Sequence, residues 1–174
     1  HEVFSSCAGA AIYRKSVFDE IGLFDESFFA YLEDMDVGCR ARLAGYRNLY
    51  NPYAKVYHLG SASSGSRHNA FKVELSARNS MWMFRKNMPA WQFVLNAPFI
   101  FAGIIIKTAY FAKKGLVKAY LKGIGAGLFG RLSGGVTTVG KDDTSSERVS
   151  GRADAVSCLK LQMWLFRGMV KRIN

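Results

Sequence analysis

Three carboxylates within four residues, Glu33, Asp34 and Asp36, are the side chains of this chain best suited to chemistry. Like charges this close repel one another, so a site that needs negative charge explains them better than packing does. A carboxylate within hydrogen-bond reach of a hydroxyl group can take its proton as a general base, which contributes about 10²- to 10⁴-fold to a rate. We therefore predict a catalytic site here, beside a metal-bound diphosphate. The alternative is a helix cap on a solvated acidic face.

One of the three histidines, His58, is the second candidate. In an expected strand over 54–58, Ala54, Val56 and His58 share one face, so His58 would leave the strand end on the inward side. A polar, glycine- and serine-rich loop that includes Arg67 follows, and sites accumulate where strands end in such loops. From the residues alone, a structural role and a ligand role for His58 both stay open. The loop is either a linker or a substrate lid.

Periodicity and turn residues predict the elements that must position these side chains. Mixed apolar and small residues predict a buried strand over 3–13, with close backbone approach at Gly9. We expect helices at 16–21, capped by Ser16 and ended by Gly22, at 33–44, ended by Gly45, and at 69–88, before Pro89. The second helix should bury Leu32, Met35, Cys39 and Leu43, with Asp34 and Asp36 off that stripe, and the third should pack through Phe71, Leu75, Met81 and Trp82.

The charge is distributed unevenly. Residues 1–90 carry 11 Lys/Arg against 9 Asp/Glu, a net +2, whereas residues 91–174 carry 13 against 4, a net +9. The basic half also holds the apolar runs, which favours an anionic membrane surface over nucleic acid. An odd number of cysteines, 3, without a C-x-x-C spacing fits a reduced cytosolic compartment.

The apolar run over 93–112 is interrupted by Asn96, Pro98 and Lys107, so we expect an interfacial or re-entrant helix, with a full membrane span as the alternative. Residues 107–131 hold six basic and no acidic residues between apolar ones, a composition typical of a helix in the headgroup region. The composition of residues 132–155 predicts a flexible linker. Residues 156–174 predict an amphipathic helix, either docked on the core or on the membrane.

Ordered motifs along residues 7–90 resemble the C-terminal part of family 2 glycosyltransferases, and most closely the rhamnosyltransferase-like enzymes of bacterial cell-surface polysaccharide synthesis. The motifs are Gly9-Ala10-Ala11-Ile12-Tyr13-Arg14-Lys15, Ile21-Gly22-Leu23-Phe24-Asp25-Glu26, Phe28-Phe29, Tyr31, Glu33-Asp34-Met35-Asp36, Arg40, Gly45-Tyr46 and His58. The resemblance implies an α/β fold, the acceptor-side half of a GT-A nucleotide-diphospho-sugar transferase over 1–90. Membrane-interface helices over 91–131, the linker over 132–155 and the helix over 156–174 would follow.

The same resemblance implies roles for single residues. Asp34 would be the general base with Glu33 and Asp36 beside it, and His58 would complete a Mg²⁺ or Mn²⁺ site. We expect substrate contacts from Gly9, Tyr31, Arg40, Arg67 and Arg78.

On this view the chain is a fragment of an inverting glycosyltransferase (a hexosyltransferase) that moves a sugar such as rhamnose. The donor would be a nucleotide-diphospho-sugar, and the acceptor a glycan or a polyprenyl-diphosphate-linked sugar at the cytoplasmic face of the cell membrane. Because the chain opens at His1 with no donor-side Asp-x-Asp motif, we expect it to be part of a longer protein and inactive by itself. The competing interpretation is a non-enzymatic membrane-surface adaptor, and a nucleic-acid binder ranks below both.

Overall fold

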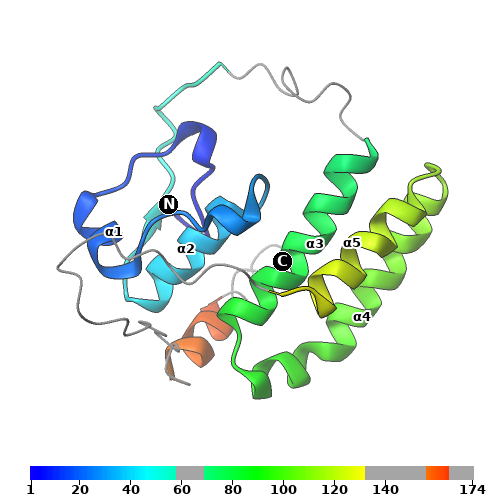
Figure 1. Cartoon of the computed structure of the whole chain (residues 1–174). Helices are drawn as coiled ribbons and strands as arrows, with labels where there is room; N and C mark the ends of the chain where they lie inside the picture. The colour runs from blue at the N-terminus through cyan, green and yellow to red at the C-terminus, as the bar shows by residue number, and fades with distance from the viewer. Residues whose placement is uncertain (58–68, 132–155, 165–174) are drawn as a thin grey trace, which may run out of the picture. The chain divides into compact units, whose positions relative to one another are not determined.

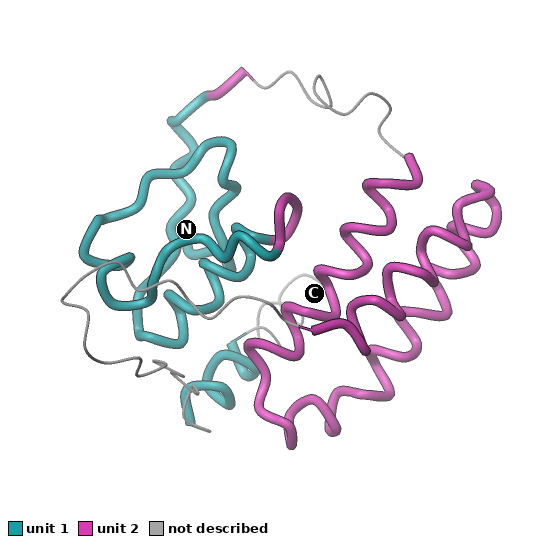
Figure 2. Tube along the Cα trace, viewed as in Figure 1, with its two compact units in different colours: residues 1–27, 33–55, 134–174 teal, residues 28–32, 56–133 magenta. Residues whose placement is uncertain are grey.

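The computed structural model describes residues 1–57, 69–131 and 156–164. The chain divides into two compact units, shown in different colours in Figure 2. Unit 1 comprises residues 1–27, 33–55 and 134–174, and unit 2 comprises residues 28–32 and 56–133. The described chain is mostly helical with one small two-stranded sheet, which is compatible with a fragment of an α/β fold. His58, Arg67 and the linker predicted over 132–155 lie outside the described residues.

Unit 1 packs two helices on each other beside the small sheet (Figure 1). Its core joins Val17 and Ile21 of the first helix to Val37 and Ala41 of the second, so the helix that begins with the acidic cluster is anchored on its apolar face. The strands pair antiparallel, with Glu2 opposite Leu49. In chain order the elements are β1 (Glu2–Val3), η1 (Ala8–Ala10), α1 (Lys15–Ile21), η2 (Glu26–Phe28, whose last residue belongs to unit 2), α2 (Glu33–Leu43) and β2 (Asn48–Leu49).

The two predicted strands of this region are wrong. Only Glu2–Val3 of the N-terminal segment is a strand, and Ala8–Ala10 form an exposed 3₁₀ turn. The small residues that suggested a buried strand instead let the chain turn toward α2, where Ala8 N–H donates to the Asp34 carboxylate. Residues 54–57 form no strand, and Val56 is exposed, so alternation of side chains there does not mark a buried face.

The predicted C-terminal ends of the two helices of unit 1 are confirmed, whereas the predicted N-terminal cap of the first is wrong. Gly22 ends α1 at φ +77°, but α1 begins after Arg14 and no side chain caps it, so Ser16 is not its cap. Gly45, at φ +91°, ends α2 and lets Tyr46 N–H reach the Ala41 carbonyl at 2.9 Å.

The buried face of α2 differs from the predicted stripe. Asp36, Val37, Cys39 and Ala41 are buried, whereas Met35 and Leu43 are only half-buried. Asp36 can be buried because Arg40 of the same helix neutralises it at 2.9 Å. Burial also raises the pKa of the Cys39 thiol to about 12, so this cysteine is a neutral packing residue.

Unit 2 is a three-helix arrangement of α3 (Ala70–Asn87), α4 (Ala90–Ala112) and α5 (Val117–Phe129), which run alongside one another in Figure 1. Asn69 caps α3 by accepting from Lys72 N–H at 2.8 Å, and Pro89 separates α3 from α4 as predicted. Leu75, Met81 and Trp82 are buried as predicted, whereas Phe71 is exposed. The core of the unit consists of Val73, Ala77 and Met81 of α3 with Tyr120 and Ile124 of α5.

The helix expected over 107–131 is interrupted, because residues 113–116 turn at Gly115 with φ +69°. The following helix, α5, packs against α3 through glycines. A Cβ atom on Gly123 would collide with the Glu74 carbonyl oxygen and lie 2.8 Å from the Ala77 Cβ atom. One face of α5 is therefore a packing face within the protein, not a lipid-contacting one.

Helix α4 runs continuously through Pro98 for 23 residues, and Gln92 is its one buried residue. It is the one helix in the described part of the chain that is long and apolar enough to cross a membrane, by length and composition. Asn96, Pro98 and Lys107, on which the interfacial or re-entrant helix was predicted, do not break it. The placement of α4 relative to a membrane stays a prediction.

The helix predicted over 156–174 is present over 156–164, and the rest lies outside the description. Cys158 is buried in unit 1, and the Arg42 guanidinium lies 3.8 Å from the centre of the Trp164 ring. This helix therefore has at least one side that packs on protein.

Candidate active site

Asp34 lies in the first turn of α2 and its carboxylate is held by two backbone amides. Ala8 N–H donates to Oδ2 at 3.2 Å, and Met35 N–H donates to Oδ1 at 2.8 Å. The side chain is half-buried, so it is fixed in position and still reachable from solvent. A carboxylate fixed in this way can act as a general base on a hydroxyl group that comes within hydrogen-bond reach.

Ser5 fixes the backbone at the same residue. Its hydroxyl group donates to the Asp34 carbonyl oxygen at 2.7 Å. This approach requires Gly38, because a Cβ atom there would lie 2.5 Å from both Cβ and Oγ of Ser5. Gly38 and Ser5 were not predicted as site residues, since only the folded chain brings them together.

Two buried polar atoms near Asp34 have no hydrogen-bond partner among the residues that the structure describes. They are the Tyr13 hydroxyl group and Oε2 of Glu33. Burial, and then the charges of Asp34, Cys7 and Glu33, raises the pKa of Tyr13, so its hydroxyl stays protonated at neutral pH. Buried polar groups are nearly always satisfied, so this pair calls for an explanation. Tyr13 belongs to one of the motifs that resemble family 2 glycosyltransferases, but it was not predicted as a site residue.

Asp36 and Arg40 form a buried ion pair that fastens the loop after α1 to α2. Asp36 is 0% exposed, and Arg40 donates to the carbonyl oxygens of Ile21, Gly22 (3.1 Å) and Leu23 (2.8 Å). This arrangement accounts for both side chains structurally. The catalytic role of Asp36 and the substrate contact of Arg40 stay predictions. Gly9 is exposed within η1, adjacent to the amide that Asp34 accepts from, and its substrate contact also stays a prediction.

In unit 2, the segment 28–32 has an unusual backbone. Phe29, Tyr31 and Leu32 have φ values of +62°, +67° and +71°, a region that residues other than glycine adopt only at a cost of about 1–3 kcal/mol each. Such strain persists only where surrounding contacts hold it. It also lies directly before the acidic cluster in the chain.

Asn79 of α3 supplies those contacts. Its Nδ2 atom lies 2.9, 2.8 and 2.8 Å from the carbonyl oxygens of Phe28, Ala30 and Tyr31, and the residue is 0% exposed. This role was not predicted from the sequence, where the available signal was a polar residue on the buried face of an amphipathic helix.

Arg78 supports the same segment, donating to the Phe28 carbonyl oxygen at 3.2 Å and stacking 4.2 Å from the Trp82 ring centre. Its burial lowers the pKa of its guanidinium from the usual value. The contacts of Tyr31 and Arg78 with substrate stay predictions.

The metal site cannot be assembled from the described residues alone. No group of three or more His, Cys, Asp or Glu side chains among them is placed to hold a metal ion. The expected ligand His58 lies outside the description. The Mg²⁺ or Mn²⁺ requirement therefore stays a prediction, and no chemical step is derived through a metal.

Comparison with known proteins connects part of the chain to sugar transfer. Over 79 residues it is 35% identical to the N-acetylglucosaminyl-diphospho-decaprenol L-rhamnosyltransferase of two strains of Mycobacterium tuberculosis, a match that covers 41% of this chain and 26% of the relative. It is also 31% identical over 80 residues to the uncharacterised protein y4gI of Sinorhizobium fredii, covering 45% of this chain and 9% of that protein. No protein-family model and no solved structure matches the chain.

The chain thus spans about a quarter of the rhamnosyltransferases that it matches. At this coarse level the comparison supports the resemblance: the matched part of the chain is glycosyltransferase-like.

Proposed function

We propose that this chain is the acceptor-side part of an inverting glycosyltransferase of the GT-A type. The observation that carries the proposal is the 35% identity with rhamnosyltransferases over 79 residues. The fixed, half-buried carboxylate of Asp34 at the start of α2 supports it, because that geometry suits a general base.

In this mechanism the Asp34 carboxylate takes the proton of an acceptor hydroxyl group. The hydroxyl oxygen forms a bond to the anomeric carbon of the donor sugar, while the bond from that carbon to the nucleoside diphosphate breaks and the diphosphate leaves. One displacement with one base inverts the configuration at the anomeric carbon. The Asp34 proton is later released to solvent, which its half-buried position permits.

The Tyr13 hydroxyl group and Glu33 Oε2 are suited to form hydrogen bonds with an acceptor sugar beside Asp34. A neutral phenol can donate a hydrogen bond and a carboxylate oxygen can accept one, which matches the alternating donors and acceptors of sugar hydroxyl groups. Both atoms are buried, so the acceptor would satisfy them only after a local movement of the chain around them.

The acceptor that we propose is linked to a lipid diphosphate, as in the name of the M. tuberculosis relatives. Helix α4 supports this, because 23 residues at a rise of about 1.5 Å give about 34 Å, comparable with the apolar core of a bilayer, which is about 30 Å thick. We place the protein at the cytoplasmic face of the cell membrane, where nucleotide-sugars are made.

The test is sugar transfer by the full-length protein. A panel of nucleotide-diphospho-sugars is offered with a polyprenyl-diphosphate-linked acceptor, and radiolabelled transfer is measured for each donor. Transfer from one donor with an inverted linkage supports the proposal, and the 174-residue chain alone should be inactive. Absence of transfer with every donor, in protein that binds vesicles normally, would instead favour a membrane-surface adaptor.

A further inference from the structure

Asn48, the first residue of β2, joins the N-terminal segment of the chain to helix α2. Its Nδ2 atom donates to the Phe4 carbonyl oxygen at 2.7 Å and to the Gly38 carbonyl oxygen at 3.1 Å. The side chain is buried, so its amide donors are used on two backbone segments away from water. A helix carbonyl such as that of Gly38 can accept this bond because its oxygen has a second lone pair.

The turn after α2 places Asn48 beside the middle of that helix. Gly45, at φ +91°, ends the helix, and β2 then pairs antiparallel with β1, with Asn48 opposite Val3. Side chains alternate between the two faces of a strand. Asn48 is therefore buried against α2, whereas the next residue, Leu49, is 62% exposed.

The N-terminal segment crosses α2 where Asn48 binds it. Ser5 follows Phe4 in the chain, and a Cβ atom on Gly38 would lie 2.5 Å from both Cβ and Oγ of Ser5. The two backbones thus approach each other too closely for any side chain at position 38. Asn48 binds the carbonyl group of Phe4 on one side of this crossing and that of Gly38 on the other, so it holds the two segments in register.

The same crossing positions the amide group from which Asp34 accepts. Ser5 Oγ donates to the Asp34 carbonyl oxygen at 2.7 Å, and Ala8 N–H, three residues later, donates to Asp34 Oδ2 at 3.2 Å. A shift of residues 4–8 along α2 would break the second bond. The bond from Met35 N–H to Oδ1 would remain, because it lies within α2. A carboxylate held by one amide instead of two can turn about its side-chain torsions.

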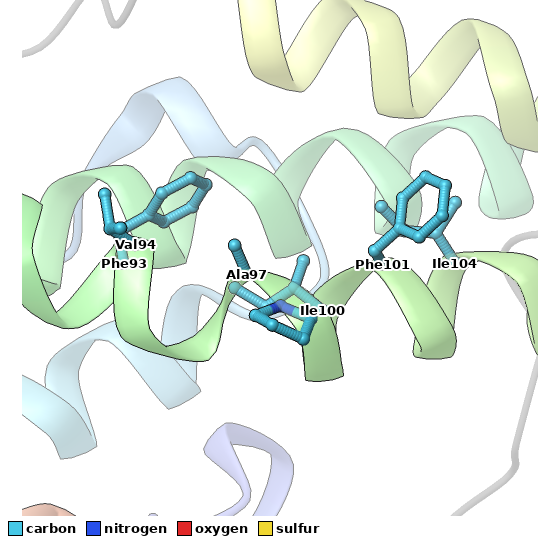
Figure 3. Close-up of a pocket in the computed structure, with 7 residues that line it drawn as sticks. Phe93, Val94, Ala97, Ile100, Phe101 and Ile104 are labelled. Atoms are coloured by element: carbon cyan, nitrogen blue, oxygen red, sulfur yellow. The ribbon is translucent and has the colours of Figure 1, made fainter.

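The cavities of the described chain show that Asn48 does not act as a ligand-binding residue of either. Two cavities, of about 500 and 340 Å³, are lined by residues of unit 2, whereas Asn48 belongs to unit 1. The larger one runs along α4, and its lining residues in Figure 3 include Phe93, Ala97, Ile100 and Ile104. Asn48 instead spends its amide donors on backbone carbonyl groups, which is a holding role.

We propose that Asn48 is a positioning residue for the general base. It holds the crossing of residues 4–8 over α2, and through the Ala8 N–H group it fixes the orientation of the Asp34 carboxylate. This inference rests on the proposed function and deepens it, because it names the side chain that sets the geometry of the base. A displacement of about 1 Å at a reacting group can cost about 10²-fold in rate.

The first measurement is amide hydrogen exchange at Ala8, followed by NMR in the 174-residue chain. Asn48→Ala should accelerate this exchange by about 3- to 10-fold, the usual effect of one lost hydrogen bond. Asn51→Ala is the matched control, because Asn51 is an exposed asparagine of the same region whose Oδ1 atom accepts locally from Tyr53 N–H at 3.0 Å. It should leave exchange at Ala8 unchanged.

The second measurement is sugar transfer by the full-length protein, at a temperature where every variant is folded. Asn48→Ala should lower kcat by about tenfold and leave the KM for the acceptor unchanged, because the orientation of the base matters in the transition state and not in binding. Gly123→Ala controls for stability. It disturbs the packing of α5 in unit 2, outside the crossing, and should keep the wild-type kcat.

Ser5→Ala is a second variant that tests the crossing if Asn48→Ala does not fold. It removes one hydroxyl group, and it should also accelerate exchange at Ala8 and lower kcat. Because Ser5 and Asn48 act through the same crossing, the double variant should lose little more kcat than Asn48→Ala alone.

Unchanged exchange at Ala8 in Asn48→Ala would overturn the proposal. An equal fall of kcat in Gly123→Ala would also overturn it, since the loss would then follow stability alone. A raised acceptor KM with unchanged kcat would contradict a positioning role, and so would additive losses in the double variant. Failure of the proposed function is a different result, because Asp34→Asn would then keep wild-type turnover whatever Asn48→Ala does to exchange at Ala8.

Discussion

At the scale of single residues, Asp34 carries the chemistry that we propose. Asp34→Asn keeps the shape of the side chain and one of the two oxygens that accept a backbone N–H, so it should fold and lose only about 1 kcal/mol of stability. An amide cannot take the acceptor proton, so transfer by the full-length protein should fall by at least about 10²-fold. The measurement is kcat with the donor identified in the panel.

Glu26→Gln is the control for this prediction, because Glu26 is an exposed carboxylate a few residues earlier in the chain. It should keep wild-type turnover. Turnover of Asp34→Asn equal to that of the wild type would remove Asp34 from the mechanism.

Tyr13 gives a second prediction at this scale. Its hydroxyl group is buried without a partner among the described residues, so Tyr13→Phe should leave the melting temperature unchanged or raise it slightly. If the hydroxyl binds the acceptor sugar, the same variant should raise the KM for the acceptor by about 5- to 10-fold, the usual effect of one neutral hydrogen bond. A lower melting temperature with an unchanged KM would show that the hydroxyl is a structural group.

At the scale of elements, Asn79 of α3 holds the strained segment 28–32. Asn79→Ala should lower the free energy of unfolding by about 1–3 kcal/mol or more, because carbonyl groups lose a buried donor. Ser80→Ala is the matched control on the same helix. The Ser80 hydroxyl group donates locally, to the Ser76 carbonyl oxygen at 2.8 Å, so its loss should cost well under 1 kcal/mol. Urea unfolding followed by circular dichroism measures the free energy of unfolding of both variants. Equal losses of free energy would contradict the role of Asn79 in holding segment 28–32.

The packing of α5 on α3 gives a prediction with a control on the same helix. A methyl group at Gly123 would collide with the backbone of α3, so Gly123→Ala should destabilise the protein by about 1–3 kcal/mol. Gly125 has open space around its Cα atom, so Gly125→Ala should stabilise α5 by up to about 1 kcal/mol through helix propensity. Thermal unfolding measures both. If the two variants shift the melting temperature in the same direction, the packing of α5 described above is wrong.

At the scale of the whole molecule, we predict that α4 holds the protein on a membrane. Phe99 and Ile106 are 78% and 69% exposed, so Phe99→Asp with Ile106→Asp should keep the fold. An aspartate within an apolar membrane helix costs about 2.5–3.5 kcal/mol, so vesicle binding should fall by at least about tenfold. The measurement is sedimentation with anionic vesicles.

Ile12→Asp is the control, because Ile12 is a fully exposed isoleucine of unit 1, and it should leave vesicle binding unchanged. High salt should weaken binding without abolishing it, because salt screens the lysines but not the apolar residues. Complete release of the intact chain by salt would contradict this prediction, because it would show that basic residues alone hold the chain on the membrane.

Local signals in the sequence determined several parts of this protein. The ends of α1, α2 and α3 follow from Gly22, Gly45 and Pro89, since positive φ and the missing proline N–H act at the residue where they occur. The acidic cluster at the start of α2 follows in the same way. So does the resemblance to glycosyltransferases, which rests on the order of motifs along the chain.

Only the tertiary structure decided which polar groups are buried and what holds them. Asp36 could enter the core because Arg40 reaches both its carboxylate and the loop after α1, and Asn79 binds carbonyl groups about 50 positions away in the chain. The expected strands at 3–13 and 54–58 depended on pairing partners, which neither the small apolar residues of the first nor the alternation of side chains in the second supplies. The sequence of α5 alone does not show that its glycines pack on α3, because close approach between helices depends on both surfaces.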